Sequence, residues 1–151
     1  MFARLKSSLP VPVLRRIAPF WVVCLIAGSL LPGEAKIVIG SSRLSEQHLQ
    51  RASVQTGEWK HRAFHIAGFG TTALLFLIIA RTGTGELLSM AGVLGLGVAI
   101  EYAQVLIFAN RLETEDIRDD AYGVAVVYAV WLAMGAAGAL RDKYTQRGSG
   151  A

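Results

Sequence analysis

Four apolar runs constrain the fold of this 151-residue chain more than any other feature of its sequence. The hydrocarbon core of a bilayer is about 30 Å thick, so a helix needs about 20 residues to cross it. The runs cover residues 17–31, 64–80, 87–109 and 121–140. The chain is 53% hydrophobic and 17% charged, whereas soluble domains average about 25% charged residues. We therefore predict an all-α integral membrane bundle of four transmembrane helices.

The ends of the chain predict its orientation, because Lys and Arg near the ends of spans favour the cytoplasmic side. Residues 1–16 form a basic tail, residues 141–151 form a second one, and we predict a single membrane domain over 17–140. Both termini are then cytoplasmic, with loops 32–63 and 110–120 outside. The first run alternatively reads as a secretory signal peptide, although no small-residue cleavage pattern follows it.

Glu101 lies inside the third run, where a charged side chain costs roughly 2.5–3.5 kcal/mol to insert. Such a carboxylate is expected to face a polar partner rather than lipid. In the predicted topology, His65 at the start of the second run and Gln104 on the third lie near the same outer face. The loop before the fourth run and its first turn add further polar residues there. We predict a polar pocket, open to the outside, formed by Arg62, His65, Glu101, Gln104, Arg111, Asp116 and Asp120.

Several of the acids have a simpler explanation. A carboxylate at a helix amino terminus caps the backbone and complements the helix dipole, each contribution being about 0.3–1 kcal/mol. We assign this role to Glu113, Glu115 and Asp119. For Asp116 and Asp120, capping and a role in the polar pocket both remain open.

The remaining polar residues also have structural alternatives. His48 and His61 fall in polar sequence that we assign to the first outer loop, and we predict no special role for either. Glu101 is too far inside its run to be a cap. The structural alternative for Glu101 is a hydrogen bond or ion pair, with His65 or Arg111, that holds the bundle together.

Small residues recur at four-residue spacing on the last two runs. This spacing lets helix backbones approach closely in lipid, where no hydrophobic force drives association. We predict that the third and fourth helices pack through these faces, and that the same faces permit an oligomer. The residues are Ala91, Gly95, Ala99 and Ala103 on the third run, and Ala121, Ala125, Ala129, Ala133 and Ala137 on the fourth.

Three short motifs occur in order between residues 62 and 123. They are Arg62-x-x-His65-x-x-x-Phe69, Glu101-x-x-Gln104, and Arg111-x4-Asp116-x3-Asp120-x-x-Gly123. The ordered set resembles the VanZ-like family, small bacterial membrane proteins named after a protein that gives resistance to the glycopeptide teicoplanin. Members usually carry Lys at the position of Arg62 and Asn at that of Asp120, and the loop 33–60 has no counterpart. The resemblance implies a multi-pass protein of the bacterial cytoplasmic (inner) membrane with a role in the cell envelope, but no defined reaction.

The predicted pocket is compatible with more than one chemistry. A histidine and carboxylates can perform acid–base catalysis, or can hold a divalent metal through His65, Glu101 and Asp116. The sequence contains no HExxH, GxSxG or phosphate-binding loop, so we predict no cofactor and favour a role other than catalysis. The net charge of +4 is explained by the orientation of the spans, and no nucleic-acid partner is expected.

These observations lead to one functional expectation and one alternative. The expectation is an outward-facing pocket that binds a cell-envelope component, or an agent acting on one, and lowers sensitivity to teicoplanin-type antibiotics. The alternative is a membrane-embedded enzyme, metal-assisted or not, that acts on a lipid-linked envelope or polysaccharide precursor. In either case the expected surroundings are a lipid bilayer.

Overall fold

The computed structural model describes residues 11–30, 46–80, 82–108 and 112–148, and the secondary structure in these ranges is entirely helical. The helices are α2 (Val11–Ser29), α4 (Glu46–Ile79), α5 (Gly83–Phe108) and α6 (Thr114–Gly148). Each contains a segment long and apolar enough to cross a membrane: Val11–Ser29, Trp59–Ile79, Gly83–Phe108 and Thr114–Thr145. The predicted all-α bundle of four membrane-spanning helices is confirmed.

The helices are longer than the apolar runs that predicted them. The second run was expected at 64–80, but α4 already begins at Glu46, so the assignment of residues 46–63 to a loop is wrong. The last helix also extends beyond the predicted 121–140 at both ends. Apolarity marks only the part of a helix that lies in lipid, whereas Glu, Gln, Arg, Lys and Ala continue a helix readily into water.

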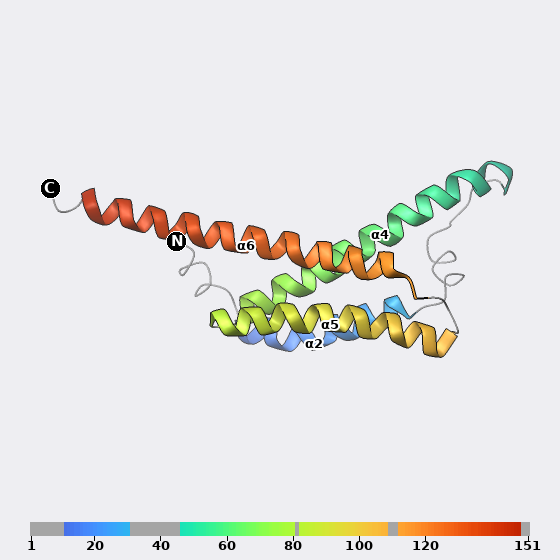
Figure 1. The fold of residues 1–151 in the computed structure, drawn as a ribbon, viewed down its shortest axis with the longest axis horizontal. Helices are drawn as coiled ribbons and strands as arrows, with labels where there is room; N and C mark the ends of the chain where they lie inside the picture. The colour runs from blue at the N-terminus through green and yellow to red at the C-terminus, as the bar shows by residue number, and fades with distance from the viewer. Residues whose placement is uncertain (1–10, 31–45, 81, 109–111, 149–151) are drawn as a thin grey trace.

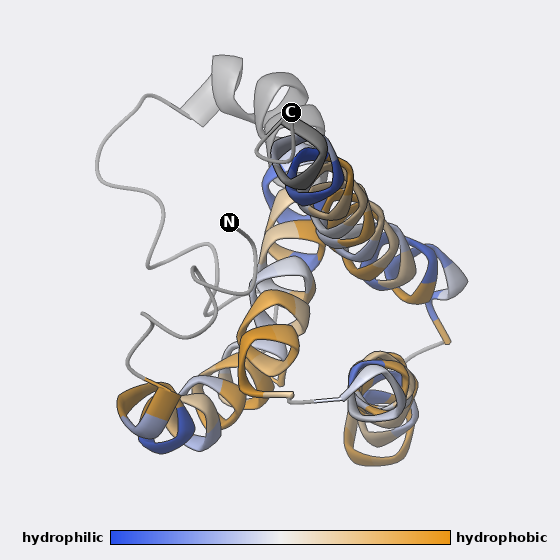
Figure 2. Ribbon diagram, turned by 90° about the vertical axis from the view of Figure 1, so that its left-hand side faces the viewer, coloured by the Kyte–Doolittle hydropathy of each residue, from blue (hydrophilic) through white to orange (hydrophobic). Residues whose placement is uncertain are grey.

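Consecutive helices run in opposite directions, and α4 occupies the centre of the bundle (Figure 1). It contacts α2, α5 and α6. The helices α2 and α5 overlap in Figure 1, but the end-on view in Figure 2 separates them. The start of α4 and the end of α6 project beyond the bundle at opposite ends (Figure 1). The amino end of α2 and the carboxyl end of α6 thus lie at one end, and the starts of α4 and α6 lie at the other.

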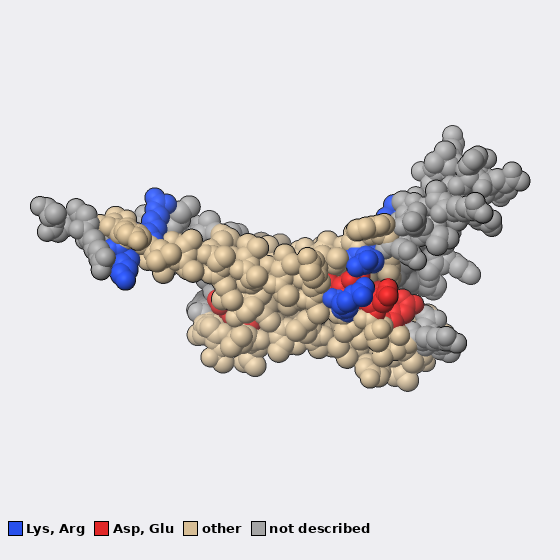
Figure 3. All heavy atoms as spheres, turned by 45° about the horizontal axis from the view of Figure 1, so that its top comes forward, with Lys and Arg blue, Asp and Glu red and all other residues tan. Residues whose placement is uncertain are grey.

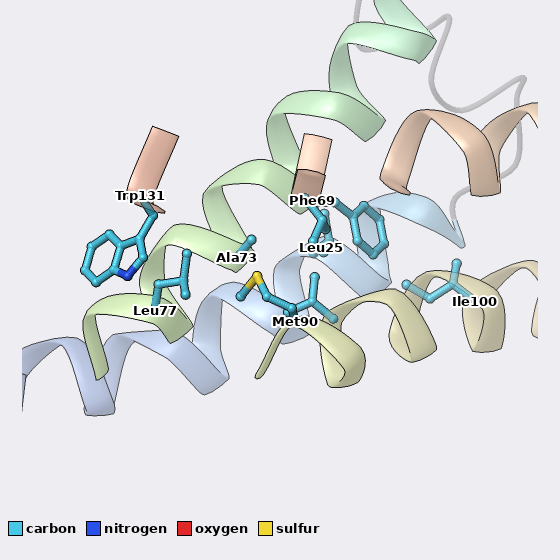
Figure 4. Close-up of a cluster of buried hydrophobic side chains, with 9 residues drawn as sticks. Leu25, Phe69, Ala73, Leu77, Met90, Ile100 and Trp131 are labelled. Carbon is cyan, nitrogen blue, oxygen red and sulfur yellow. The ribbon is translucent and has the colours of Figure 1, made fainter. Parts of the chain in front are cut away.

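An apolar core fills the space around α4. Leu77 and Ala73 of α4 are fully buried there, beside Met90 of α5 and Trp131 of α6 (Figure 4). On the surface shown in Figure 3, the charged side chains gather toward the two ends, and an uncharged band lies between them. This distribution matches a helical bundle with its middle in lipid.

The closest helix crossing joins α4 to α6 and depends on glycine. A Cβ atom added to Gly123 would collide with the backbone carbonyl of Ile66, and one added to Gly70 would lie 3.4 Å from the Gly123 carbonyl oxygen. The predicted packing of α5 against α6 through their small-residue faces is wrong, since Ala99 is exposed and an added Cβ at Gly95 would meet nothing within 4 Å. The helix with the closest contact to α6 is α4, which the four-residue spacing did not identify.

Candidate functional site: a buried histidine–carboxylate cluster

Two helices bring histidines and aspartates together at the end of the bundle where α4 enters it and α6 begins. His61 and His65 are four residues apart on α4 and therefore share one face of the helix. Asp116 and Asp120 have the same spacing on α6. Because the two helices run antiparallel and cross here, the pairs face each other.

The distances show that the four side chains form a connected cluster. Nε2 of His61 lies 2.8 Å from Oδ2 of Asp116. Nδ1 of His65 lies 2.7 Å from Oδ1 of Asp120, and its Nε2 lies 3.3 Å from the same Asp116 oxygen. One carboxylate oxygen of Asp116 is therefore shared between two imidazole rings.

His65 is oriented by its surroundings. Its Nδ1–H donates to Asp120, and the ring stacks on Phe69 with 6.2 Å between centroids. The residue is 1% exposed, and its Nε2 makes no hydrogen bond within the described residues. The Asp116 oxygen 3.3 Å away is near it but does not make a hydrogen bond with it, and a buried polar atom without a hydrogen bond is rare in native proteins and calls for an explanation.

The helix α5 adds a carboxylate to the same region. Glu101 is 1% exposed, and its Oε1 also finds no hydrogen-bond partner among the residues that the structure describes. The carboxyl group interacts electrostatically with Asp116 and His65 and with the backbone of Glu113. Gly97, one turn earlier on α5, permits this close packing, since a Cβ there would lie 2.6 Å from an Asp120 oxygen.

A charge-assisted pair closes the edge of the cluster. Nε and Nη2 of Arg62 lie 2.8 and 3.2 Å from the two oxygens of Asp119, which is the bidentate geometry that guanidinium favours. Asp119 is 2% exposed, and Arg118 is 3.7 Å from it. The assignment of Asp119 to helix capping is wrong, because its side chain is buried and directed to α4. Arg62 is thereby engaged with a carboxylate, so the cluster as a whole is acidic.

The other predicted site residues have different positions. Gln104 donates from Nε2 to the backbone oxygen of Ser29, 2.9 Å away, and so contributes to the contact between α5 and α2. Arg111 lies outside the described residues. The structure thus brings together Arg62, His65, Glu101, Asp116 and Asp120 from three helices.

Two residues of the cluster, His61 and Asp119, were missed by the sequence analysis. His61 was expected to have no role because it was assigned to a loop, whereas it lies on α4 with its side chain one-third exposed. The spacing His61-x3-His65 would have identified it, since it places two imidazoles on one face of any helix that covers both residues. No comparable signal distinguishes Asp119 from the acids beside it.

Comparison with known proteins adds no further identification. No family model matches the chain, and no match was found among curated proteins or solved structures. The fold and the cluster define a class, a multi-pass helical membrane protein with a buried histidine–carboxylate site at one end. The VanZ-like resemblance remains a hypothesis based on three motifs, and it leads to the proposals below.

Proposed function

We propose that this chain is a VanZ-like protein of the bacterial cytoplasmic membrane, and that its cluster binds the polar group of a cell-envelope component or of an agent acting on one. The observation that carries the proposal is the pair of buried atoms, His65 Nε2 and Glu101 Oε1, that have no hydrogen-bond partner within the described residues. Stability alone favours pairing such atoms, so their retention suits contact with a ligand. The polar group that fits an acidic cluster is rich in hydroxyl or amine donors.

An adjacent groove favours a ligand with a lipid tail. A depression of about 330 Å³ lies between α4 and α6, lined by apolar and small residues that include Ile66, Gly70, Gly123 and Val127. Ile66 directly follows His65 in α4, so one end of the groove lies at the same level of the helix as the cluster. A lipid-linked envelope component would place its chain in this groove and its polar group at the histidines.

The proposal places the cluster at the outer face of the membrane, because the basic tails favour a cytoplasmic location for both termini. Cysteine accessibility tests this orientation in a Cys24→Ser background. The cysteine of Thr114→Cys, at the start of α6, should react with a membrane-impermeant maleimide in intact cells, whereas that of Thr84→Cys, at the start of α5, should react only after lysis. Labelling of Thr84→Cys, and not of Thr114→Cys, in intact cells would reverse the orientation.

The functional test is teicoplanin tolerance in a sensitive bacterial host. The wild type should raise the inhibitory concentration. Glu101→Gln, which keeps the shape and a hydrogen-bonding group, should retain part of the effect, whereas Glu101→Ala should lose it. Membrane levels of each variant are measured in parallel. No tolerance from the wild type would refute the resistance role, and full tolerance from Glu101→Ala would refute the site.

A second function, hydrolysis or group transfer on a lipid-linked envelope precursor, is favoured by one specific observation. Asp120 fixes the ring of His65 through Nδ1 and directs Nε2 into the cluster, which is how a carboxylate orients a catalytic histidine. Acid–base catalysis by Glu101 would make Glu101→Gln lose orders of magnitude in turnover, because the amide cannot take up the proton. Turnover of a lipid-linked precursor by the purified wild type, and its loss in this variant, would establish the enzyme over the binding protein.

A further inference from the structure

We propose that His61, His65 and Asp116 bind one divalent transition-metal ion, with Zn²⁺ as the ion that their donor atoms fit. The site would supply the cluster with a positive charge and an open coordination position. It rests on the geometry of this chain and stands whether or not the envelope ligand proposed above is correct.

The three candidate ligand atoms lie close together. Each of the three residues offers one atom, and these atoms all lie within 4.8 Å of one another. The shared oxygen of Asp116 is 2.8 Å from Nε2 of His61 and 3.3 Å from Nε2 of His65. Ligands bound to tetrahedral zinc at about 2.0–2.1 Å are separated by roughly 3.3 Å. The contact of His65 with Asp116 already has this spacing, and the His61 side chain would have to move to reach it.

The buried nitrogen of His65 provides independent support. In the neutral ring whose Nδ1–H donates to Asp120, Nε2 presents a lone pair to the Asp116 oxygen 3.3 Å away, and these two acceptors repel. A metal ion between them converts this repulsion into two coordinate bonds. The arrangement carboxylate–histidine–metal is the usual support for a histidine ligand, with Asp120 as the outer carboxylate.

The charge of the cluster favours a cation. Asp119 is neutralised by Arg62, but Asp116, Asp120 and Glu101 are buried carboxylates whose described partners include only histidines and backbone. Burying unpaired negative charge is costly, and a divalent cation offsets that cost directly.

The donor set narrows the choice of ion. Two imidazoles and one carboxylate suit zinc and other divalent transition metals, whereas magnesium and calcium prefer oxygen ligands. Three protein ligands leave the fourth zinc position open, as in catalytic rather than structural zinc sites. Glu101, whose Oε1 lacks a hydrogen-bond partner in the described part of the chain, interacts electrostatically with two of the proposed ligands, Asp116 and His65.

Metal binding is tested on the full-length protein in lipid nanodiscs after treatment with a chelator and dialysis. Elemental analysis after incubation with Zn²⁺ should give one ion per chain, and Co²⁺ should produce the visible absorption bands of a tetrahedral site. His65→Ala and Asp116→Ala should bind more than 100-fold more weakly, beyond the roughly 10–100-fold expected for Asp120→Asn, which loses only the orienting charge.

Matched controls separate metal binding from folding. His48→Ala removes the third histidine of the chain and should bind as the wild type does. His61→Ala, at the exposed edge of the cluster, should preserve the helical circular dichroism spectrum and still lose the Co²⁺ bands. The proposal is overturned if the wild type retains no zinc after dialysis, or if His61→Ala and His65→Ala retain as much as His48→Ala.

Discussion

The polar end and the apolar middle of this bundle are held together in different ways. In the middle, Leu77, Ala73 and Trp131 belong to one cluster of buried hydrophobic side chains. At the polar end, four acids and His65 are buried, and two of their polar atoms have no hydrogen-bond partner within the described residues. Stability alone would favour a hydrogen bond for each of these two atoms. This difference is the reason why we propose the polar end as the ligand site.

The largest effect on stability is expected where α4 and α6 cross at Gly70 and Gly123. Gly123→Val would push a branched side chain into the carbonyl of Ile66 and separate α6 from α4, so we expect loss of the folded protein. Gly95→Val makes the same change where an added Cβ meets nothing within 4 Å, and should leave the fold intact. Size-exclusion profiles in mild detergent distinguish the two. Equal profiles would show that the crossing does not depend on Gly123.

A smaller effect is expected in the apolar middle. Leu77→Ala removes a completely buried side chain and leaves a cavity, which should lower the free energy of unfolding by about 2–5 kcal/mol. Leu74→Ala makes the same change on the neighbouring turn, where the side chain is 41% exposed to the surroundings, and should have little effect. Titration with a denaturing detergent measures both. Equal losses would contradict the position of the core, and neither variant should alter zinc binding.

The smallest effect on stability is expected at the edge of the polar end. Arg62→Gln leaves Asp119 buried without its bidentate partner, and should lower the free energy of unfolding by about 1–3 kcal/mol. Arg118→Gln is the control, because Arg118 is 60% exposed and 3.7 Å from the same carboxylate, and surface changes stay within about 0.5 kcal/mol. The same detergent titration applies. If Arg118→Gln were the more damaging change, the pairing of Asp119 with Arg62 would be wrong.

The sequence predicted the membrane segments better than the contacts between them. Apolar runs indicate where lipid surrounds a helix, so four spans were found, but they give no signal for the polar first part of α4. The small residues at four-residue spacing indicate which face of a helix another helix can approach closely, but they do not indicate which helix does so. The close contact of α6 with α4 occurs at Gly70 and Gly123. These two glycines are isolated in the sequence, and their role is visible only in three dimensions.

The site was predicted in part for a related reason. Glu101 was identified because a charge in an apolar run is costly, and His65 because the topology put it at the same depth. Asp119 could not be separated from the capping acids without the position of Arg62, and His61 was lost with the loop assignment. The roles of these two residues depend on how α4 and α6 are aligned against each other, which the sequence does not show.

The most direct test of the central claim, that the polar end is a ligand site and not a structural ion network, is nitrogen-15 NMR of His65 in the full-length protein. We expect Nδ1 to stay protonated through its hydrogen bond to Asp120, and Zn²⁺ to shift the Nε2 resonance to that of a metal-bound imidazole. If both nitrogens carry protons and neither resonance changes when Zn²⁺ is added, His65 is a fixed ion-pair partner between Asp116 and Asp120, and the claim is wrong.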